Sequence, residues 1–298
     1  MRVLLWHVHG SWTNAFVRGG HEYLLPASPE GGDWGRGLAG RNWPAAREVP
    51  LDSLSDVDAD VVVLQRPQEA ERVPGVPAVY LEHNTPKHPG QRHPLADWPG
   101  IIVHVTHFNQ LMWDCGTTRT EVIEHGVVDP GPLYTGELAR AAVVVNEPVR
   151  RGRVVGTDLL PRFAEVAPLD VYGMGTEQLG EMGRGDHGMD ALHAELARRR
   201  LYLHPVRWTS LGLSLLEAMH LGMPVVALAC TEVVRAVPPE AGVVSTRVED
   251  LVRGVAELVA DPELARQKGK QAREFALAHY GLDAFLRNWE RLLAEVSG

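Results

Sequence analysis

The feature that most constrains this chain is a repeated alternation of short apolar runs with helical patterns, interrupted once by a turn-rich stretch. Apolar runs that end near Gly, Pro, His or Asn are typical of buried parallel strands leading into loops. The first series of runs comprises Val3–Val8, His21–Leu25, Val61–Gln65, Ala78–Leu81, Ile101–Thr106 and Glu121–Ile123. The second comprises Ala142–Asn146, Leu169–Tyr172, Leu201–Leu203, Val225–Leu228 and Gly242–Val244. Two such series predict an α/β chain with two Rossmann-like, doubly wound domains.

The turn-rich stretch marks the expected boundary between these domains. It contains Asp129-Pro130-Gly131-Pro132, which indicates a linker. We expect an N-terminal domain over residues 1–130, a C-terminal domain over 142–280 and a terminal helix over 281–298. Further helices are expected at Asp158–Val166, Met189–Arg199, Leu213–Leu221, Val248–Leu258 and Pro262–His279.

Two further segments are the terminal helix and a glycine-rich stretch. Apolar residues recur at steps of three or four from Leu282 to Val296, which predicts a helix with a single apolar face. That face packs either on the N-terminal domain or on the C-terminal domain. The segment Gly31–Gly40 is expected to be a mobile loop, because no strand leads directly into it and no GK[ST] follows.

Composition excludes several classes of protein. The net charge of −9 argues against nucleic-acid binding, and no basic amphipathic stretch favours an anionic membrane. The opening MRVLLWHVHG is expected to be a strand and not a signal peptide, and no apolar run approaches 18 residues. Cys115 and Cys230 have no partner spacing for a disulfide framework or a zinc site. We therefore expect a cytoplasmic enzyme.

The segment Leu201–Leu228 carries most of the chemistry. It is expected to form a strand, a loop, a helix and a second strand, with Thr209 and Ser210 as helix-capping residues. Gly212 leaves the amides from Ser210 through Leu211 to Leu213 open to a ligand, and free amides at a helix start suit a diphosphate. Glu217 lies on an otherwise apolar helix, where a carboxylate is costly to bury unless hydrogen-bond donors reach it. The two hydroxyls of a ribose would supply such donors.

This segment closely resembles the signature of retaining GT-B glycosyltransferases of the family-4 type, P-S-x-x-E-x-F-G-L-x-x-x-E-A-M-A-x-G-x-P-V-V. The matching positions are Pro205, Gly212, Leu213, Glu217, Ala218, Met219, Gly222, Pro224, Val225 and Val226. The resemblance implies a GT-B fold, with two domains about a central cleft and a terminal helix that returns to the N-terminal domain. It also implies that Glu217 holds the ribose of the donor. The first glutamate of the signature, which contacts the donor sugar, is replaced here by Thr209.

Two further segments resemble the same family. The stretch from Asn146 to Leu160 is similar to G-R-x-x-x-x-K-G-x-D-x-L, whose Arg and Lys clamp the donor diphosphate. Arg150 matches the Arg, Val155 occupies the Lys position, and Arg153 is the candidate for the missing charge. His83, which follows a predicted strand, resembles the family histidine that contacts the transferred sugar. Gly10 resembles the glycine under the donor phosphates.

The remaining candidates concern the acceptor and a possible metal. Ser11, Trp12 and Asn84 follow the ends of predicted strands and are expected on the acceptor side, with Trp12 stacking on the acceptor. Asp56, Asp58 and Asp60 precede the strand Val61–Gln65, whereas ligands of doubly wound folds lie beyond the carboxyl ends of strands. We therefore expect no metal site.

These resemblances imply a hexosyl-type glycosyltransferase of carbohydrate biosynthesis. The expected reaction moves a sugar from a UDP- or GDP-sugar to an acceptor hydroxyl, with retention, without metal and without a cofactor other than the nucleotide-sugar co-substrate. His83, Arg150 and Glu217 are the expected catalytic residues. The acceptor, whether a glycan, a lipid-linked sugar or a small molecule, is left open. Two alternatives stay open as well: a nucleotide-sugar-binding partner protein without turnover, and a GT-B sugar-nucleotide epimerase.

Overall fold

The computed structural model describes all 298 residues, which divide into two compact units. Unit 1 consists of Met1–Val128 and Tyr280–Gly298, and unit 2 of Asp129–His279. The boundaries differ from the expected ones because the stretch expected to be a linker packs on unit 2. Within it, the Tyr134 hydroxyl donates to the Arg200 carbonyl at 2.7 Å, and the Tyr134 amide donates to the Leu221 carbonyl at 3.1 Å.

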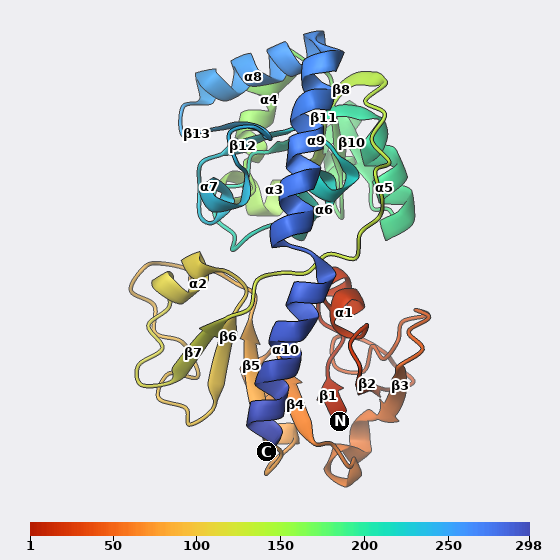
Figure 1. Cartoon of the computed structure of the whole chain (residues 1–298), viewed down its shortest axis with the longest axis vertical. Helices are drawn as coiled ribbons and strands as arrows, with labels where there is room; N and C mark the ends of the chain where they lie inside the picture. Colours follow the sequence, from red (N-terminus) through yellow and green to blue (C-terminus); the bar gives the residue numbers. More distant parts are fainter. The chain divides into compact units, whose positions relative to one another are not determined.

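Unit 1 is built on a sheet of seven parallel strands in the order β3-β2-β1-β4-β5-β6-β7 (Figure 1). The strands are β1 (Arg2–Leu5), β2 (Glu22–Ala27), β3 (Ala46–Pro50), β4 (Val61–Leu64), β5 (Ala78–Glu82), β6 (Ile101–His104) and β7 (Arg119–Val122). The central strands β4, β5 and β6 are buried almost throughout, because apolar side chains are covered on both faces of the sheet.

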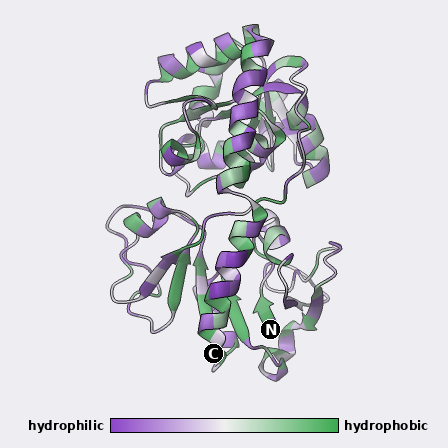
Figure 2. Ribbon diagram, in the orientation of Figure 1, coloured by the Kyte–Doolittle hydropathy of each residue, from purple (hydrophilic) through white to green (hydrophobic).

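Unit 1 contains α1 (Gly10–Phe16), α2 (His107–Met112) and α10 (Leu282–Ser297), with 3-10 turns η1 (Leu51–Asp56) and η2 (Pro67–Arg72). The apolar face of α10 is visible as alternating colours in Figure 2, and its Phe285 and Trp289 are buried. The Trp289 ring lies 5.7 Å from Trp12 and 5.1 Å from Phe16 of α1. The terminal helix thus packs within unit 1.

Unit 2 is a second parallel sheet, in the order β10-β9-β8-β11-β12-β13. Its strands are β8 (Leu138–Val144), β9 (Leu169–Tyr172), β10 (Gly183–Gly185), β11 (Arg199–His204), β12 (Val225–Leu228) and β13 (Gly242–Ser245). Its α-helices are α3 (Pro148–Arg151), α4 (Leu160–Ala164), α5 (Met189–Arg198), α6 (Leu213–Leu221), α7 (Val233–Ala236), α8 (Val248–Ala260) and α9 (Pro262–His279). Three 3-10 turns complete it: η3 (Gly152–Val154), η4 (Thr157–Leu159) and η5 (Thr176–Met182). None of the helices in the chain combines the length and apolar character needed to cross a membrane.

The helix expected over Asp158–Val166 is shorter than predicted. A 3-10 turn covers Thr157–Leu159, and the α-helix starts only at Leu160, with Pro161 in its first turn. Proline favours the first turn of a helix because it lacks the amide hydrogen that an interior position must donate. The pattern therefore identified the helix but not its start.

The strand orders locate where each unit can bind a ligand. Each sheet winds outward in both directions from one strand pair, β1 and β4 in unit 1 and β8 and β11 in unit 2. At such a switch point the loops after the two strands diverge, which leaves a crevice beyond their carboxyl ends. The sites of both units are therefore expected after β1, β4, β8 and β11.

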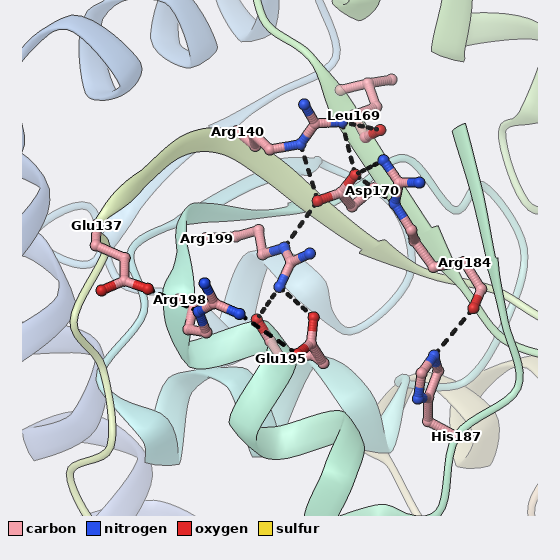
Figure 3. Close-up of polar contacts among 9 residues, drawn as sticks. All are labelled: Glu137, Arg140, Leu169, Asp170, Arg184, His187, Glu195, Arg198 and Arg199. Atoms are coloured by element: carbon pink, nitrogen blue, oxygen red, sulfur yellow. Dashed lines mark hydrogen bonds and ion pairs between the residues drawn. The ribbon is translucent and has the colours of Figure 1, made fainter. Parts of the chain in front are cut away.

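A buried carboxylate ties together four adjacent strands of unit 2, away from these carboxyl ends. Asp170 of β9 accepts hydrogen bonds from Arg140 of β8, Arg184 of β10 and Arg199 of β11 (Figure 3). The donor–acceptor distances are 2.7–2.9 Å. Arg199 also donates to Glu195 at 2.6 Å. Because each guanidinium has a carboxylate partner, this cluster is a structural tie.

The glycine-rich loop of unit 1, Gly31–Gly40, is hydrogen-bonded to its surroundings, and its mobility stays a prediction. Its backbone pairs with the end of β2: Ser28 donates to Gly35 and Gly37 donates to Pro26, both at 3.0 Å. The His7 Nδ1 atom lies 2.9 Å from the Gly37 carbonyl. The backbone and side-chain bonds that hold the loop come from residues outside it, so glycine content alone could not reveal them.

Candidate active site

The loop between β11 and α6 forms the core of the candidate site in unit 2. Helix α6 begins at Leu213, and its N-cap is Gly212 with extended backbone angles (φ −69°, ψ 123°) and no side-chain cap. The prediction that Thr209 and Ser210 cap this helix is therefore wrong, because the helix starts three residues beyond Ser210. The first amides of α6 have no partner within the helix, so they and the helix dipole suit an anion.

A buried histidine lies against this helix start. His204, the last residue of β11, is 2% exposed, and neither ring nitrogen has a hydrogen-bond partner. A Cβ atom on Gly212 would lie 3.1 Å from the His204 ring, so glycine leaves room for the imidazole under the N-cap. Burial lowers the pKa of His204 to about 4. At neutral pH the ring is uncharged and can donate one hydrogen bond and accept another.

Glu217 is almost buried yet has no hydrogen-bond donor from the protein. It lies on α6 and is 7% exposed, and His193 of α5 is beside it, with 3.5 Å between His193 Nε2 and the carboxylate. The Nε2 atom of His193 has no hydrogen-bond partner either. A buried carboxylate without donors is costly unless a ligand supplies them. Glu217 was predicted from the sequence, whereas His193 was not, because it lies on a different helix.

An arginine cluster joins the β8–α4 and β11–α6 loops. Asp158 accepts bonds from Arg207 at 2.6 and 2.9 Å and from Arg153 at 2.9 Å. The Arg207 amide donates to the Val154 carbonyl at 2.9 Å. Gly156 has a φ of 80°, and a Cβ there would lie 2.1 Å from the Pro205 carbonyl, so only glycine fits this contact. The two loops are therefore packed against each other and joined by hydrogen bonds.

The predicted phosphate-binding arginines lie on or near this cluster. Arg150 is exposed and 3.5 Å from Glu147, whereas Arg153 is partly neutralised by Asp158. Val155, which replaces the family lysine, is 2% exposed and belongs to the core. Arg207 was not singled out from the sequence, although it lies two residues before Thr209. It adds a second guanidinium to the pair of loops, so two cations share the one carboxylate of Asp158.

Thr209 and Leu211 complete the loop. Leu211 is 4% exposed and Ser210 is buried as well, so of the three residues before Gly212 only Thr209 is partly exposed. The backbone of this stretch, and not the Ser210 or Leu211 side chain, is what a ligand could contact.

Three imidazoles gather at the carboxyl ends of the strands in unit 1. The ring of His83, which follows β5, lies 4.0 Å from His9 and 6.3 Å from His125. Burial lowers the pKa of His9 to about 4 and of His125 to about 3, and it lowers the pKa of His83 well below its usual value. His83 was predicted, but its two neighbours come from segments 74 and 42 residues away in sequence (83 − 9 and 125 − 83), so their grouping is a tertiary feature.

The other predicted residues of unit 1 differ in how far they are buried. Gly10 and Ser11 form the first turn of α1, and a Cβ on Gly10 would have no atom closer than 3.9 Å. Asn84 is exposed beside His83. Trp12 is 1% exposed and stacks on Phe16 at 4.6 Å. The prediction that Trp12 stacks on an acceptor is wrong, because the first turn of α1 directs this side chain into the core beneath α10.

Comparison with known proteins finds one matching family segment and several solved structures of similar fold. Residues 184–275 match the family described as glycosyl transferases group 1. No curated protein matches the sequence. Among solved structures, HepE from Anabaena, determined in complex with UDP, superposes with a TM-score of 0.73 at 14% identity, over 99% of this chain and 100% of that one. Sucrose-phosphate synthase from Thermosynechococcus elongatus has a TM-score of 0.72 at 14% identity, over 99% and 98% of the two chains.

A longer structure is also similar. TarM from S. aureus gives a TM-score of 0.64 at 16% identity, over 78% of this chain, which spans only about half of TarM (54%). The matched family segment contains α5, α6 and most of α9, and hence Glu217 and its loop. The chain therefore has the two-sheet GT-B fold of these solved structures, and its segment 184–275 is similar to group 1 glycosyl transferases.

Proposed function

We propose that this chain transfers a sugar from a nucleotide-diphosphate sugar to an acceptor hydroxyl, with retention and without a metal ion. The observation that carries the proposal is Glu217: a nearly buried carboxylate, without a protein donor, one turn inside a helix whose first amides are open. The diol of a ribose would satisfy this carboxylate, and the diphosphate would then reach the start of α6.

The arginine cluster can stabilise the nucleotide diphosphate as it leaves the sugar. As the bond between the sugar and the diphosphate breaks, negative charge develops on the leaving oxygen, and preorganised donors lower the barrier most where charge develops. The amides of α6, Arg150 and the pair Arg153 and Arg207 are the donors available in unit 2. UDP is the first donor nucleotide to test, since HepE has been solved in complex with UDP and with UDP-glucose.

Replacing Glu217 tests the ribose assignment. We expect Glu217→Gln to weaken UDP binding by about 1–3 kcal/mol, because the carboxylate would lose charge-assisted hydrogen bonds to the diol. Titration calorimetry of the full chain with UDP measures this change. Glu240→Gln, an exposed position of the same unit, is the matched control. Equal affinity of the Glu217→Gln variant and the unaltered protein would contradict the assignment.

Metal independence is tested separately. We expect transfer activity to survive EDTA, because guanidiniums and helix amides can neutralise the diphosphate. The aspartates Asp58 and Asp60, the acidic run in unit 1, are already paired with Arg2. Activity is assayed as sugar transfer from UDP-glucose before and after chelation. Loss of activity that Mg²⁺ or Mn²⁺ restores would contradict this proposal.

One observation favours a second candidate, a nucleotide-sugar-binding protein without turnover. The two substitutions at family positions, Thr209 and Val155, remove a carboxylate and an ammonium group, and Val155 is built into the core. UDP binding without transfer or donor hydrolysis would establish that candidate and exclude the transferase.

A further inference from the structure

Several arginines of unit 1 have no partner in the protein, and two of them lie on one loop. Arg36 and Arg41 lie on the loop after β2 and are exposed, and neither guanidinium makes an ion pair or a side-chain hydrogen bond. The arginines of unit 2 shown in Figure 3 differ, because Asp170 and Glu195 neutralise them. Arg36 and Arg41 therefore retain their full positive charge for a ligand.

The loop holds these arginines in place. Arg36 forms an antiparallel bridge with Ala27 at the end of β2. Gly37, the next residue, is bonded through its carbonyl to His7. Beyond Arg41, Trp43 donates to the Asn14 side chain of α1 at 3.0 Å, and its ring lies 4.9 Å from His7. The backbone of the loop is thus fixed beside the carboxyl end of β1 before any ligand arrives.

The electrostatics at this strand end are positive. Burial lowers the pKa of His7, and the charges of Arg36 and Arg41 lower it further. Burial and the charge of Arg36 lower the pKa of His9 to about 4. No carboxylate acts on either imidazole. One carboxylate, that of Glu48, is bonded to this loop, where it accepts from the Leu38 amide at 2.8 Å. The two guanidiniums outnumber it, and the loop lies at the switch point of the unit 1 sheet.

Neutral hydrogen-bonding groups follow the same strand, because His9 comes shortly after His7, whose ring contacts the loop that carries the arginines. His9 adjoins His83, and both rings are uncharged at neutral pH because burial depresses their pKa values. Neutral imidazoles suit hydroxyl groups, whereas guanidiniums suit the planar oxygens of a phosphate or carboxylate. The surface thus has one part for hydroxyls and another for an anion.

We propose that the acceptor carries a negatively charged group, a phosphate monoester or a carboxylate, and that Arg36 and Arg41 bind it while His9 and His83 contact a hydroxyl. This inference rests on the proposed function and names its acceptor class. Arg36 and Arg41 then determine acceptor specificity, whereas the donor residues are those of unit 2.

The test compares acceptors that differ only in charge. The full chain is assayed with UDP-glucose as donor, and with glucose, glucose 6-phosphate and glucuronic acid, or glycerol and glycerol 3-phosphate, as acceptors. We expect charged acceptors to be preferred at least tenfold in kcat/KM. In the double variant Arg36→Gln/Arg41→Gln this preference should fall by about 10–100-fold, mainly through KM, as expected for lost charge-assisted bonds. Comparison of phosphate and carboxylate arms identifies the anion.

Two controls separate the possible outcomes. Arg18→Gln, an exposed arginine just beyond the far end of α1, should leave the preference unchanged. Hydrolysis of UDP-glucose without acceptor is measured in parallel, because it reports on the donor reaction alone. If donor is hydrolysed but charged acceptors are not preferred, or if the preference survives in the double variant, the acceptor inference is overturned and the proposed function stands. If no donor is bound or hydrolysed, the acceptor inference and the proposed function are both overturned.

Discussion

Lowering the pH from 7 to 5 is expected to destabilise unit 1 by at least about 4 kcal/mol, which is the share of two of its histidines that are buried without charge. His104 and His125 are 0% and 4% exposed, and burial lowers the pKa of each to about 3. In the unfolded chain each would titrate near pH 6.5. The unfolded state therefore binds protons first, and stability present above pH 6.5 is lost as pH falls towards the folded pKa. At pH 5 this amounts to about 2 kcal/mol per histidine.

Lowering the pH from 7 to 5 should destabilise unit 2 less than unit 1. Its His204, with a pKa of about 4, contributes about 2 kcal/mol over the same interval. Since a domain is typically stable by only about 5–15 kcal/mol, a loss of 4 kcal/mol in unit 1 is large. Seven of the eight tryptophans lie in unit 1, so tryptophan fluorescence follows its unfolding, and far-ultraviolet circular dichroism follows both units.

The variant His125→Asn isolates the cause. It removes one proton-binding group, so the pH dependence of urea unfolding between pH 7 and 5 should become shallower by about one proton. His88→Asn, at an exposed position, serves as the control. A midpoint that does not change between pH 7 and 5, or an unaltered slope in His125→Asn, would contradict the explanation.

The second large effect is expected at Asp170. Replacing it by Asn should destabilise unit 2 by about 3–5 kcal/mol, because three guanidiniums would lose their shared carboxylate in a nearly buried position. Urea unfolding followed by circular dichroism measures the loss. Asp186→Asn, at an exposed position without an ion pair, is the matched control. A change below about 1 kcal/mol would show that the cluster does not tie the strands together.

The pH dependence of Asp170 has a defined window. Burial raises its pKa, but the bonds from Arg140, Arg199 and Arg184 outweigh burial and lower the pKa to about 2. Because the folded pKa is depressed, the contribution is fully present above about pH 4 and is lost as pH falls towards 2, below the range in which the histidines act. Asp170→Asn should therefore reduce the loss of stability between pH 4 and 2.

Strand prediction succeeded for the central strands of both sheets and failed at two edges. Central parallel strands such as Val61–Leu64 are covered on both faces, so their sequences are unbroken runs of apolar residues. β3 and β10 were missed, because Ala46–Pro50 carries two charges and Gly183–Gly185 is Gly-Arg-Gly. Both are edge strands, whose neighbours on one side are absent, so their sequences need not be apolar.

Within the candidate site, the structure confirms the helix bounds predicted from one local motif, whereas the roles of its residues stay predictions. Glu217 and Gly212 lie in a single loop and helix, and α6 begins and ends at Leu213 and Leu221 as predicted. Arg207, His193 and His204 were not predicted, since their roles depend on Asp158, Glu217 and the α6 N-cap, respectively. Trp12 was misplaced because a strand-end position does not reveal which way the first turn of a short helix directs its side chains.

Local sequence patterns were enough to predict the two α/β units, most of their buried strands and the helix that carries Glu217, because periodicity and glycine placement act between residues close in the chain. Only the tertiary structure decided which distant groups meet: the three imidazoles of His9, His83 and His125, the shared carboxylate of Asp158, and the free cations Arg36 and Arg41 beside β1. The physical reason is that burial and long-range electrostatics depend on the three-dimensional packing of segments, which no local pattern records.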